Sequence, residues 1–233
     1  ATFDQGTATP VPGDWMAPFS SRGGPGQTLG ISKPDITAPG VQILAGNTPM
    51  GATVETGSPG ELFQSIQGTS MSSPHIAGAG ALLKDLHPGW TPGQIKSALM
   101  MTAKTEGVFK EDGATPADPF DYGSGRVDLT KAGHPSLTIS DTAANFVARE
   151  DDLWNANYPS LYVLAIIKAI TVKRTLHNEV PYKQVWSTSV TSPPDLKVKV
   201  NSYISVPAGG NKTIKITVDA SKVPLGEVRF AEI

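Results

Sequence analysis

Ser70 is the residue whose setting in this sequence best suits chemistry. It lies in the segment Gly-Thr-Ser-Met-Ser-Ser-Pro-His-Ile-Ala-Gly, residues 68–78. Gly68 allows a tight turn and the close approach of a substrate, and a predicted helix follows directly. The backbone N–H of Ser70 could then face a developing oxyanion, with the helix dipole behind it. These features favour a nucleophilic serine, although a serine that only caps a helix fits the spacing equally well.

The helix that must position Ser70 is predicted from Ser73 to Leu86. Gly78 and Gly80 lie at its centre, where each costs roughly 1 kcal/mol relative to alanine. We therefore expect close packing around this helix, in a crowded core. Pro74 is expected in the first turn, where its missing N–H is no loss.

A second helix is predicted after a break at residues 87–90. Thr91 is its expected N-cap, Pro92 takes the first helical position, and Gln94 completes a capping box. Before residue 60 the chain is rich in turn-forming residues, and one short strand, Val41 to Ala45, is expected there.

The pattern becomes that of β-structure after about residue 135. Period-2 alternation is clear in residues 170–175, 197–200 and 214–218, and turn signals separate these stretches. Several short strands at this spacing predict a small antiparallel β-sandwich. We place the boundary between the two parts at residues 135 and 136.

Composition excludes several classes of protein and site. The chain has 233 residues, of which 39% are hydrophobic and 17% charged, as expected of a folded protein. The formal charge of -2 predicts no attraction to nucleic acid or anionic membranes, and lysines and arginines form no basic arm. No apolar run approaches the roughly 20 residues that span a bilayer. The absence of cysteine excludes disulfides and thiolate ligands.

Four segments together resemble subtilisin-like serine proteases (subtilases). They are Phe-Ser-Ser-Arg-Gly at residues 19–23, Lys-Pro-Asp-Ile-Thr-Ala-Pro-Gly-Val at 33–41, residues 68–78, and Tyr-Gly-Ser-Gly at 122–125. Their order and approximate spacing are those of the family. The resemblance implies a three-layer α/β domain with a parallel sheet, in which Ser70 is the catalytic nucleophile and its backbone N–H contributes to the oxyanion hole. A weaker resemblance, Asn-Tyr-Pro-Ser at 157–160 followed by residues 171–175, implies a fibronectin-III-like domain after it.

The rest of the catalytic triad is not found. In subtilisin the triad residues follow the order Asp, His, Ser, but no histidine precedes Ser70; the histidines are His75, His87, His134 and His177. His75 should point away from Ser70 along the helix, and the other three are expected at the surface or in turns. The aspartates before Ser70, at positions 4, 14 and 35, lack the family's Asp-Ser/Thr-Gly setting. Asn47 lies after the Ala-Pro-Gly segment and so does not match the family's oxyanion asparagine.

The sequence therefore predicts a fragment of a subtilisin-like serine endopeptidase, inactive alone. Residues 1–135 would be the C-terminal part of the peptidase domain, and 136–233 a truncated fibronectin-III-like β-sandwich. We expect a peptide or protein substrate, no nucleic-acid partner, no membrane span, and self-association of the incomplete chain. The parent would be secreted or on the cell surface, with its signal peptide outside these residues. No cofactor or metal site is predicted; family resemblance admits calcium without assigning ligands. The alternative is a non-catalytic protein-binding module on a degenerate subtilase support.

Overall fold

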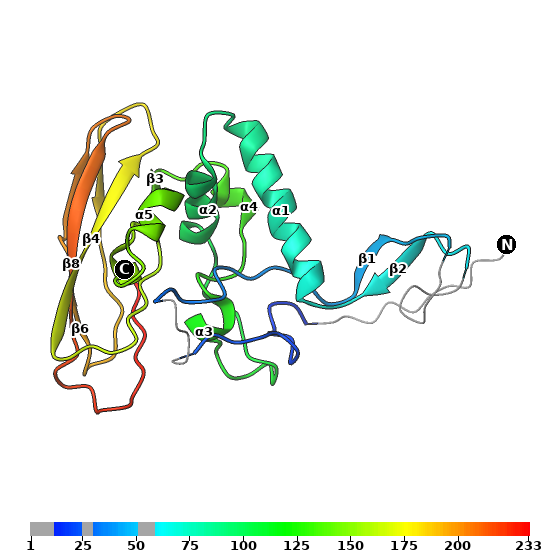
Figure 1. The fold of residues 1–233 in the computed structure, drawn as a ribbon, viewed down its shortest axis with the longest axis horizontal. Coiled ribbons are helices and arrows are strands. Elements are labelled where there is room, and N and C mark those ends of the chain that lie inside the picture. The colour runs from blue at the N-terminus through cyan, green and yellow to red at the C-terminus, as the bar shows by residue number, and fades with distance from the viewer. Residues whose placement is uncertain (1–11, 25–29, 51–58) are drawn as a thin grey trace.

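The computed structural model describes residues 12–24, 30–50 and 59–233, and it combines helices with antiparallel sheets. In Figure 1 the ribbon of β1 and β2 projects from one side, the helices lie in the middle, and the larger sheet lies on the other side. The elements up to residue 135 are β1 (Ile43–Gly46), β2 (Phe63–Ile66), α1 (Thr69–Leu86), α2 (Pro92–Met101), α3 (Pro119–Tyr122) and α4 (Leu129–Ala132).

Helix α1 begins four residues earlier than the sequence predicted, at Thr69. Gly68 is its N-cap, and the carbonyl of Gly68 accepts hydrogen bonds from the N–H groups of Met71 and Ser72, at 3.0 and 3.3 Å. Pro74 is therefore the sixth helical residue rather than part of the first turn. A proline there cannot donate to the carbonyl of Ser70, four residues earlier, so the regular helical hydrogen bond is missing at this point.

The expected crowded core around α1 is not found in the described part of the chain. Only Ala79 and Leu83 of the helix are buried. A side chain at Gly78 would meet no atom within 4 Å, and one at Gly80 would only touch Ile95 at 3.8 Å. The two central glycines therefore gain no compensating close contacts here.

Helix α2 confirms its predicted start. Thr91 and Gln94 form the capping box, with the hydroxyl of Thr91 accepting from the N–H of Gln94 at 3.3 Å. The helix buries Ala98 and Leu99 against α1 and α4. The members of this cluster are Ala79, Leu83, Trp90, Ala98, Leu99 and Ala132.

The region after residue 135 holds two antiparallel sheets. One has the strand order β3-β4-β8-β6, and the other pairs β5 with β7. The elements are β3 (Leu137–Thr138), α5 (Ala143–Val147), η2 (Leu153–Asn155), β4 (Ala169–Asn178), β5 (Gln184–Ser187), β6 (Lys197–Lys199), β7 (Tyr203–Val206) and β8 (Asn211–Asp219). Alternate residues of β4, β7 and β8 enter one hydrophobic core, so the predicted period-2 strands are present.

The coarse fold class, α/β with an antiparallel part, agrees with the structure. All pairings between strands β1 to β8 are antiparallel, and the parallel pairings among the described residues are two isolated bridges, Trp15 with Phe109 and Thr37 with Arg126. The parallel-sheet layering, the fibronectin-III-like assignment and the boundary at 135 stay predictions. In the described ranges, none of the helices has the length and apolar character needed to cross a membrane.

Candidate active site

Ser70 is the second residue of α1, and its side chain is exposed. Strand β2 leads into it through Gln67 and Gly68, so the serine lies at a strand-to-helix turn. Gly68 has φ 153° and ψ 163°, a backbone conformation that favours glycine. The first N–H groups of a helix have no carbonyl one turn earlier to which they can donate. The site thus presents an exposed hydroxyl beside a helix N-terminus.

The segment Ala38–Gly40 fixes this turn from a distant part of the sequence. Gly68 donates its N–H to the carbonyl of Gly40 at 2.8 Å, and the hydroxyl of Ser72 donates to the carbonyl of Ala38 at 2.9 Å. A Cβ at Gly40 would lie 2.2 Å from the hydroxyl oxygen of Ser72. A side chain at position 40 would therefore displace the Ser72 hydroxyl from its hydrogen bond with Ala38, and its Cβ would also lie 2.9 Å from the carbonyl oxygen of Gly68.

The Lys-Pro-Asp and Tyr-Gly-Ser-Gly segments also meet. The N–H of Ser124 donates to the carbonyl of Asp35 at 3.0 Å, and the N–H of Thr37 donates to the carbonyl of Gly125 at 2.9 Å. Gly123 has φ 71°, and a Cβ there would come within 2.3 Å of the carbonyl oxygen of Pro34. The segments quoted from the sequence therefore form one connected support behind the turn that carries Ser70.

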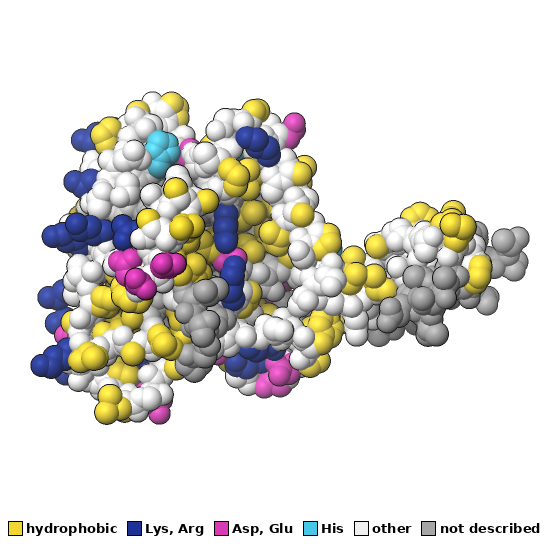
Figure 2. Space-filling model, in the orientation of Figure 1, with side chains coloured by type: hydrophobic (Ala, Val, Ile, Leu, Met, Phe, Trp, Pro, Cys, Tyr) yellow, Lys and Arg dark blue, Asp and Glu magenta, His cyan; other side chains and the backbone are white. Residues whose placement is uncertain are grey.

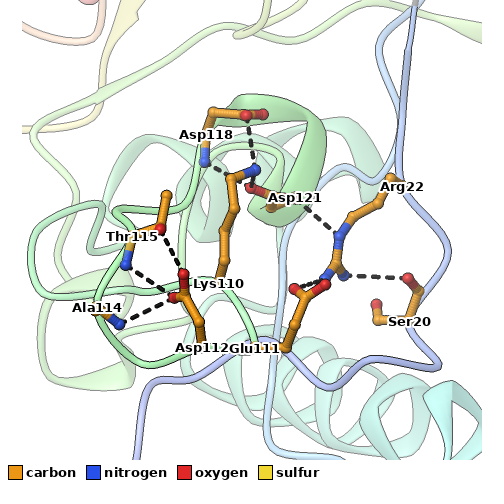
Figure 3. A network of polar contacts seen from close by, with 9 residues as sticks. All are labelled: Ser20, Arg22, Lys110, Glu111, Asp112, Ala114, Thr115, Asp118 and Asp121. Carbon is orange, nitrogen blue, oxygen red and sulfur yellow. Dashed lines mark hydrogen bonds and ion pairs between the residues drawn. The ribbon is translucent and has the colours of Figure 1, made fainter.

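A network of charged side chains attaches the remaining segment, residues 19–23, to this support (Figure 3). Asp121 of α3 is 3% exposed, and its carboxylate contacts Arg22 at 2.8 Å and Lys110 at 2.5 Å. Arg22 also contacts Glu111 at 2.9 Å. The hydrogen bond to Asp121 raises the pKa of Lys110. This buried carboxylate is thus neutralised from two sides and holds three chain segments together.

Each of the four histidines makes contacts elsewhere in the structure. His75 is exposed, and its Nδ1 lies 2.8 Å from the carbonyl of Met71 in its own helix. His87 follows the C-terminal end of α1, about 25 Å from Ser70 by helix geometry, where its ring stacks on Trp90 at 3.8 Å. His134 is exposed and lies edge-on to His87, at 6.4 Å between ring centroids.

His177 corrects one detail of the sequence reading. It was expected at the surface or in a turn, but it is a half-buried residue of β4, where its Nδ1 lies 2.9 Å from Oδ1 of Asn211. The strand pattern of residues 170–175 simply continues through it.

Of the upstream aspartates, Asp14 and Asp35 have structural partners. Asp14 pairs with Arg126 at 2.5 Å, and Asp4 lies outside the described residues. Asp35 contacts the ammonium groups of Lys33 at 2.5 Å and Lys96 at 3.0 Å, and it accepts a hydrogen bond from the hydroxyl of Tyr158. These contacts agree with a structural role for Asp35.

Asp35 and Tyr158 connect the two parts of the chain. Burial raises the pKa of the Asp35 carboxyl, but the hydrogen bonds from Lys33, Tyr158 and Lys96 outweigh it, so that pKa lies below the usual range. Burial and the nearby Asp35 carboxylate raise the pKa of Tyr158. The ammonium group of Lys96 also lies 4.9 Å from the centre of the Tyr158 ring. A carboxylate and a neutral phenol are thus the stable forms here.

The adjacent acidic residues Glu111 and Asp112 form an ion pair with Arg22 and a turn, respectively. The carboxylate of Asp112 accepts from the N–H groups of Ala114 and Thr115, at 3.0 and 2.8 Å. The hydroxyl of Thr115 lowers the pKa of Asp112 to about 2, with help from these backbone groups. In the described ranges, no three side chains of His, Cys, Asp or Glu cluster as metal ligands.

Several positioning residues had no signal in the sequence. Ser72 had no predicted role, whereas its hydroxyl donates to the carbonyl of Ala38. Tyr158 was quoted for its motif, and nothing in that motif predicted its bond to Asp35, 123 residues earlier. Asn47, which sequence order rejected as the oxyanion residue, follows β1, and its N–H donates to the carbonyl of Leu62 at 2.7 Å.

Comparisons with known proteins agree with the motif pattern. The model of the Subtilase family matches residues 7–125. Subtilisin-like protease SBT5.4 of Arabidopsis thaliana is 38% identical over 205 residues, covering 75% of this chain and 26% of the relative. Subtilisin-like protease SBT1.6 of the same plant is 31% identical over 259 residues, covering 93% of this chain and 34% of the relative. The chain therefore spans about a quarter to a third of the length of these curated relatives.

Proposed function

Because this chain belongs to the subtilase family of serine proteases, we propose that it is part of an endopeptidase in which Ser70 is the nucleophile. The observation that carries the proposal is the placement of Ser70, exposed at the start of α1 on a turn that Gly40 and Ser72 hold in place. Ser70 would attack the scissile carbonyl of a peptide or protein substrate as the general base takes its proton. The C–N bond would then break, and the amine product would leave with that proton, which gives the acyl-enzyme. Water would then hydrolyse the acyl-enzyme.

The backbone N–H of Ser70 would stabilise the oxyanion of the tetrahedral intermediate. It belongs to the first turn of an 18-residue helix, whose N-terminus carries partial positive charge. Hydrogen-bond donors that are already oriented toward the developing charge stabilise the transition state without further reorganisation. The rigid turn around Gly68 supports this role.

The general base and the orienting acid would come from residues outside this sequence. The four histidines have other partners or lie far from Ser70, and Asp14 and Asp35 form ion pairs. We therefore propose that the 233 residues alone are inactive. Residues 1–135 would form part of the peptidase domain, and 136–233 a fibronectin-III-like domain. The intact protein would be secreted or on the cell surface.

The exposed apolar residues of α1 and of the ribbon support an incomplete peptidase domain. Leu82 and Leu86 of α1 are 63% and 51% exposed, and Leu44 and Phe63 of the ribbon are 72% and 67% exposed. Burying such side chains is favourable by about 1.5 to 3 kcal/mol each. We propose that the remainder of the peptidase domain covers them, and that the isolated chain associates with itself.

A chimaera tests the role of Ser70. The matching segment of one of the Arabidopsis relatives is replaced by residues 15–133 of this chain, and peptide hydrolysis and labelling by a fluorophosphonate probe are measured. Ser70→Ala should lower turnover about 10⁶-fold, the loss found in subtilisin without its serine. Ser73→Ala, an exposed serine of the same helix, is the matched control and should retain activity. Labelling of a serine other than Ser70, or an active Ser70→Ala chimaera, would contradict the proposal.

The rival function, a protein-binding module on a degenerate subtilase support, makes a different prediction for the parent gene. The endopeptidase requires an Asp-Ser/Thr-Gly motif and a His-Gly motif before residue 1 of this chain. A parent that lacks both motifs could not complete a triad around Ser70.

A further inference from the structure

The outer face of the sheet β4-β8-β6 carries paired polar side chains. Each pair of residues that lie directly opposite each other on β4 and β8 forms one rung of the strand ladder. On one rung, the hydroxyls of Thr171 and Thr217 lie 2.9 Å apart. Those of Thr175 and Thr213 are also 2.9 Å apart. Each of these rungs thus satisfies its own polar groups across the two strands.

One rung of this ladder pairs two like charges. Lys173 of β4 lies directly opposite Lys215 of β8, between the two threonine rungs, and both lysines are exposed. Like charges placed opposite each other on neighbouring strands repel and destabilise a sheet. The cost is unexplained by the sheet itself, because among the described residues neither ammonium group has a carboxylate within 4.0 Å.

Two more lysines extend the positive charge onto the next strand. Lys197 and Lys199 of β6 are exposed and lie opposite Asp219 and Thr217 of β8. Asp219 is the one acidic residue on this face of the three described strands, and one of its carboxylate oxygens accepts the N–H of Ser221 at 3.0 Å. Figure 2 shows the resulting row of lysine and arginine side chains along the sheet side of the molecule.

The sequence alone did not predict that these lysines lie on one face. They come from three separate strands, and the whole chain has a formal charge of -2. Residues two apart on a strand are separated by roughly 6.6 Å, and neighbouring strands by about 4.8 Å. Four ammonium groups therefore lie within a patch on the order of 15 Å across, which can contact several negative groups of one extended molecule.

The side chains around the lysines indicate the kind of partner. The exposed and half-buried positions of this face, on the described strands, hold mainly lysine and threonine, with Ala169, Asn211 and Asp219. Its one ring is the half-buried imidazole of His177, whose Nδ1 lies 2.9 Å from Oδ1 of Asn211. Stable protein interfaces are centred on aromatic, apolar or arginine side chains, and single-stranded nucleic acid needs aromatic rings on which its bases stack. Ammonium and hydroxyl groups instead match the repeated carboxylates and hydroxyls of an acidic sugar chain.

We propose that the outer face of β4, β8 and β6, centred on Lys173 and Lys215, binds an acidic polysaccharide of the polyuronate class. The lysines would pair with successive carboxylates, and the neighbouring threonines would exchange hydrogen bonds with sugar hydroxyls. This surface is separate from Ser70, so the proposal does not depend on the protease function.

Binding of the full chain to polygalacturonate, measured in low salt, tests the proposal. The variant Lys173→Thr/Lys215→Thr extends the threonine rungs and keeps residues that favour strands. It should weaken binding about tenfold and reduce its salt dependence, because fewer ion pairs form. The matched control, Lys131→Thr/Lys183→Thr, removes the same charge from exposed lysines outside this face and should bind as the unaltered chain does. Lys173→Arg/Lys215→Arg should also retain binding. Circular dichroism spectra of all variants serve as the control that each one is folded.

Four outcomes would overturn the proposal. The first is that the unaltered chain fails to bind polygalacturonate. The second is that it binds a neutral dextran equally well. The third is that the control variant loses as much affinity as the Lys173→Thr/Lys215→Thr variant, which would make net charge the cause of binding. The fourth is that phosphatidylserine vesicles or duplex DNA bind to the same two lysines more tightly than polygalacturonate does. That result would assign the face to a different polyanion.

Discussion

Helix α2 separates two regions that are packed to very different degrees. On one side, two sheets enclose a core in which Val172 and Val206 are fully buried. On the other side, α1 buries only Ala79 and Leu83 and leaves Leu82 63% exposed. The serine-bearing helix is therefore positioned by the turn at its N-terminus and by α2, whereas the sheet region is stabilised by its own core.

The largest difference should appear between two leucine truncations. Leu176→Ala removes a side chain that is 3% exposed in the sheet core, and it should lower the free energy of unfolding by about 3 kcal/mol. Leu82→Ala makes the same change on α1 and should alter it by less than about 0.5 kcal/mol. Urea unfolding measures both. Equal losses would show that the two regions are packed alike.

A buried arginine offers a second test of the sheet region. Arg174 is 3% exposed, burial lowers its pKa to about 10, and its guanidinium donates to the carbonyls of Trp154, Tyr158 and Ser160. Arg174→Met leaves these carbonyls without their donor and should cost about 2 kcal/mol. Arg149→Met changes a partly exposed arginine with a single ion pair at 3.4 Å and should cost almost nothing. Thermal unfolding of both variants makes the comparison.

The contact between Asp35 and Tyr158 should make stability depend on pH. Because the pKa of Asp35 in the folded protein lies below its ordinary value of 3.8, the folded state favours the carboxylate. This stabilisation is present above about pH 4 and is lost as the pH falls through the lowered pKa. Asp35→Asn should cost about 1.5 kcal/mol at pH 7 and should flatten the decline in acid. The free energy of unfolding is measured against pH for both proteins. If it falls in acid as steeply for Asp35→Asn as for the unaltered chain, other carboxylates cause the decline.

The smallest effect on stability, and the clearest effect on association, is expected on α1. Leu82→Lys/Leu86→Lys should change the free energy of unfolding by less than about 0.5 kcal/mol, since both side chains are already exposed. The same variant should bind less of an apolar dye and sediment as a smaller species. If the unaltered chain were monomeric and bound no dye, the proposed self-association would be wrong.

Local patterns in the sequence predicted the elements that local chemistry determines. The capping box at Thr91 and the alternation in β4 and β8 were read correctly, because each depends on neighbouring residues alone. The start of α1 was misplaced because Pro74 was taken as a mark of the first turn, whereas the glycine N-cap at residue 68 decides it.

Long-range contacts could not be predicted in the same way. Nothing in the residue pattern predicted that Ala38–Gly40 lies against the turn of Ser70, and the hydrogen bond from Ser72 to Ala38 had no signal. The opposition of Lys173 and Lys215 depends on strand register, which residue spacing does not specify. The number of exposed side chains on α1 likewise depends on which parts of the fold surround it.

Helix α2 also determines how the chain can be divided for expression. The hydroxyl of Ser97 in α2 accepts the buried N–H of Ile139 at 2.7 Å, and Gln94 donates to Glu179 at 3.1 Å. A recombinant fragment that begins at residue 136 would leave the Ile139 N–H without its acceptor and expose the strand edge that α2 covers. A fragment that begins before Trp90 keeps this helix, and it is the shorter piece most suited to carrying the lysine face into crystallisation or NMR.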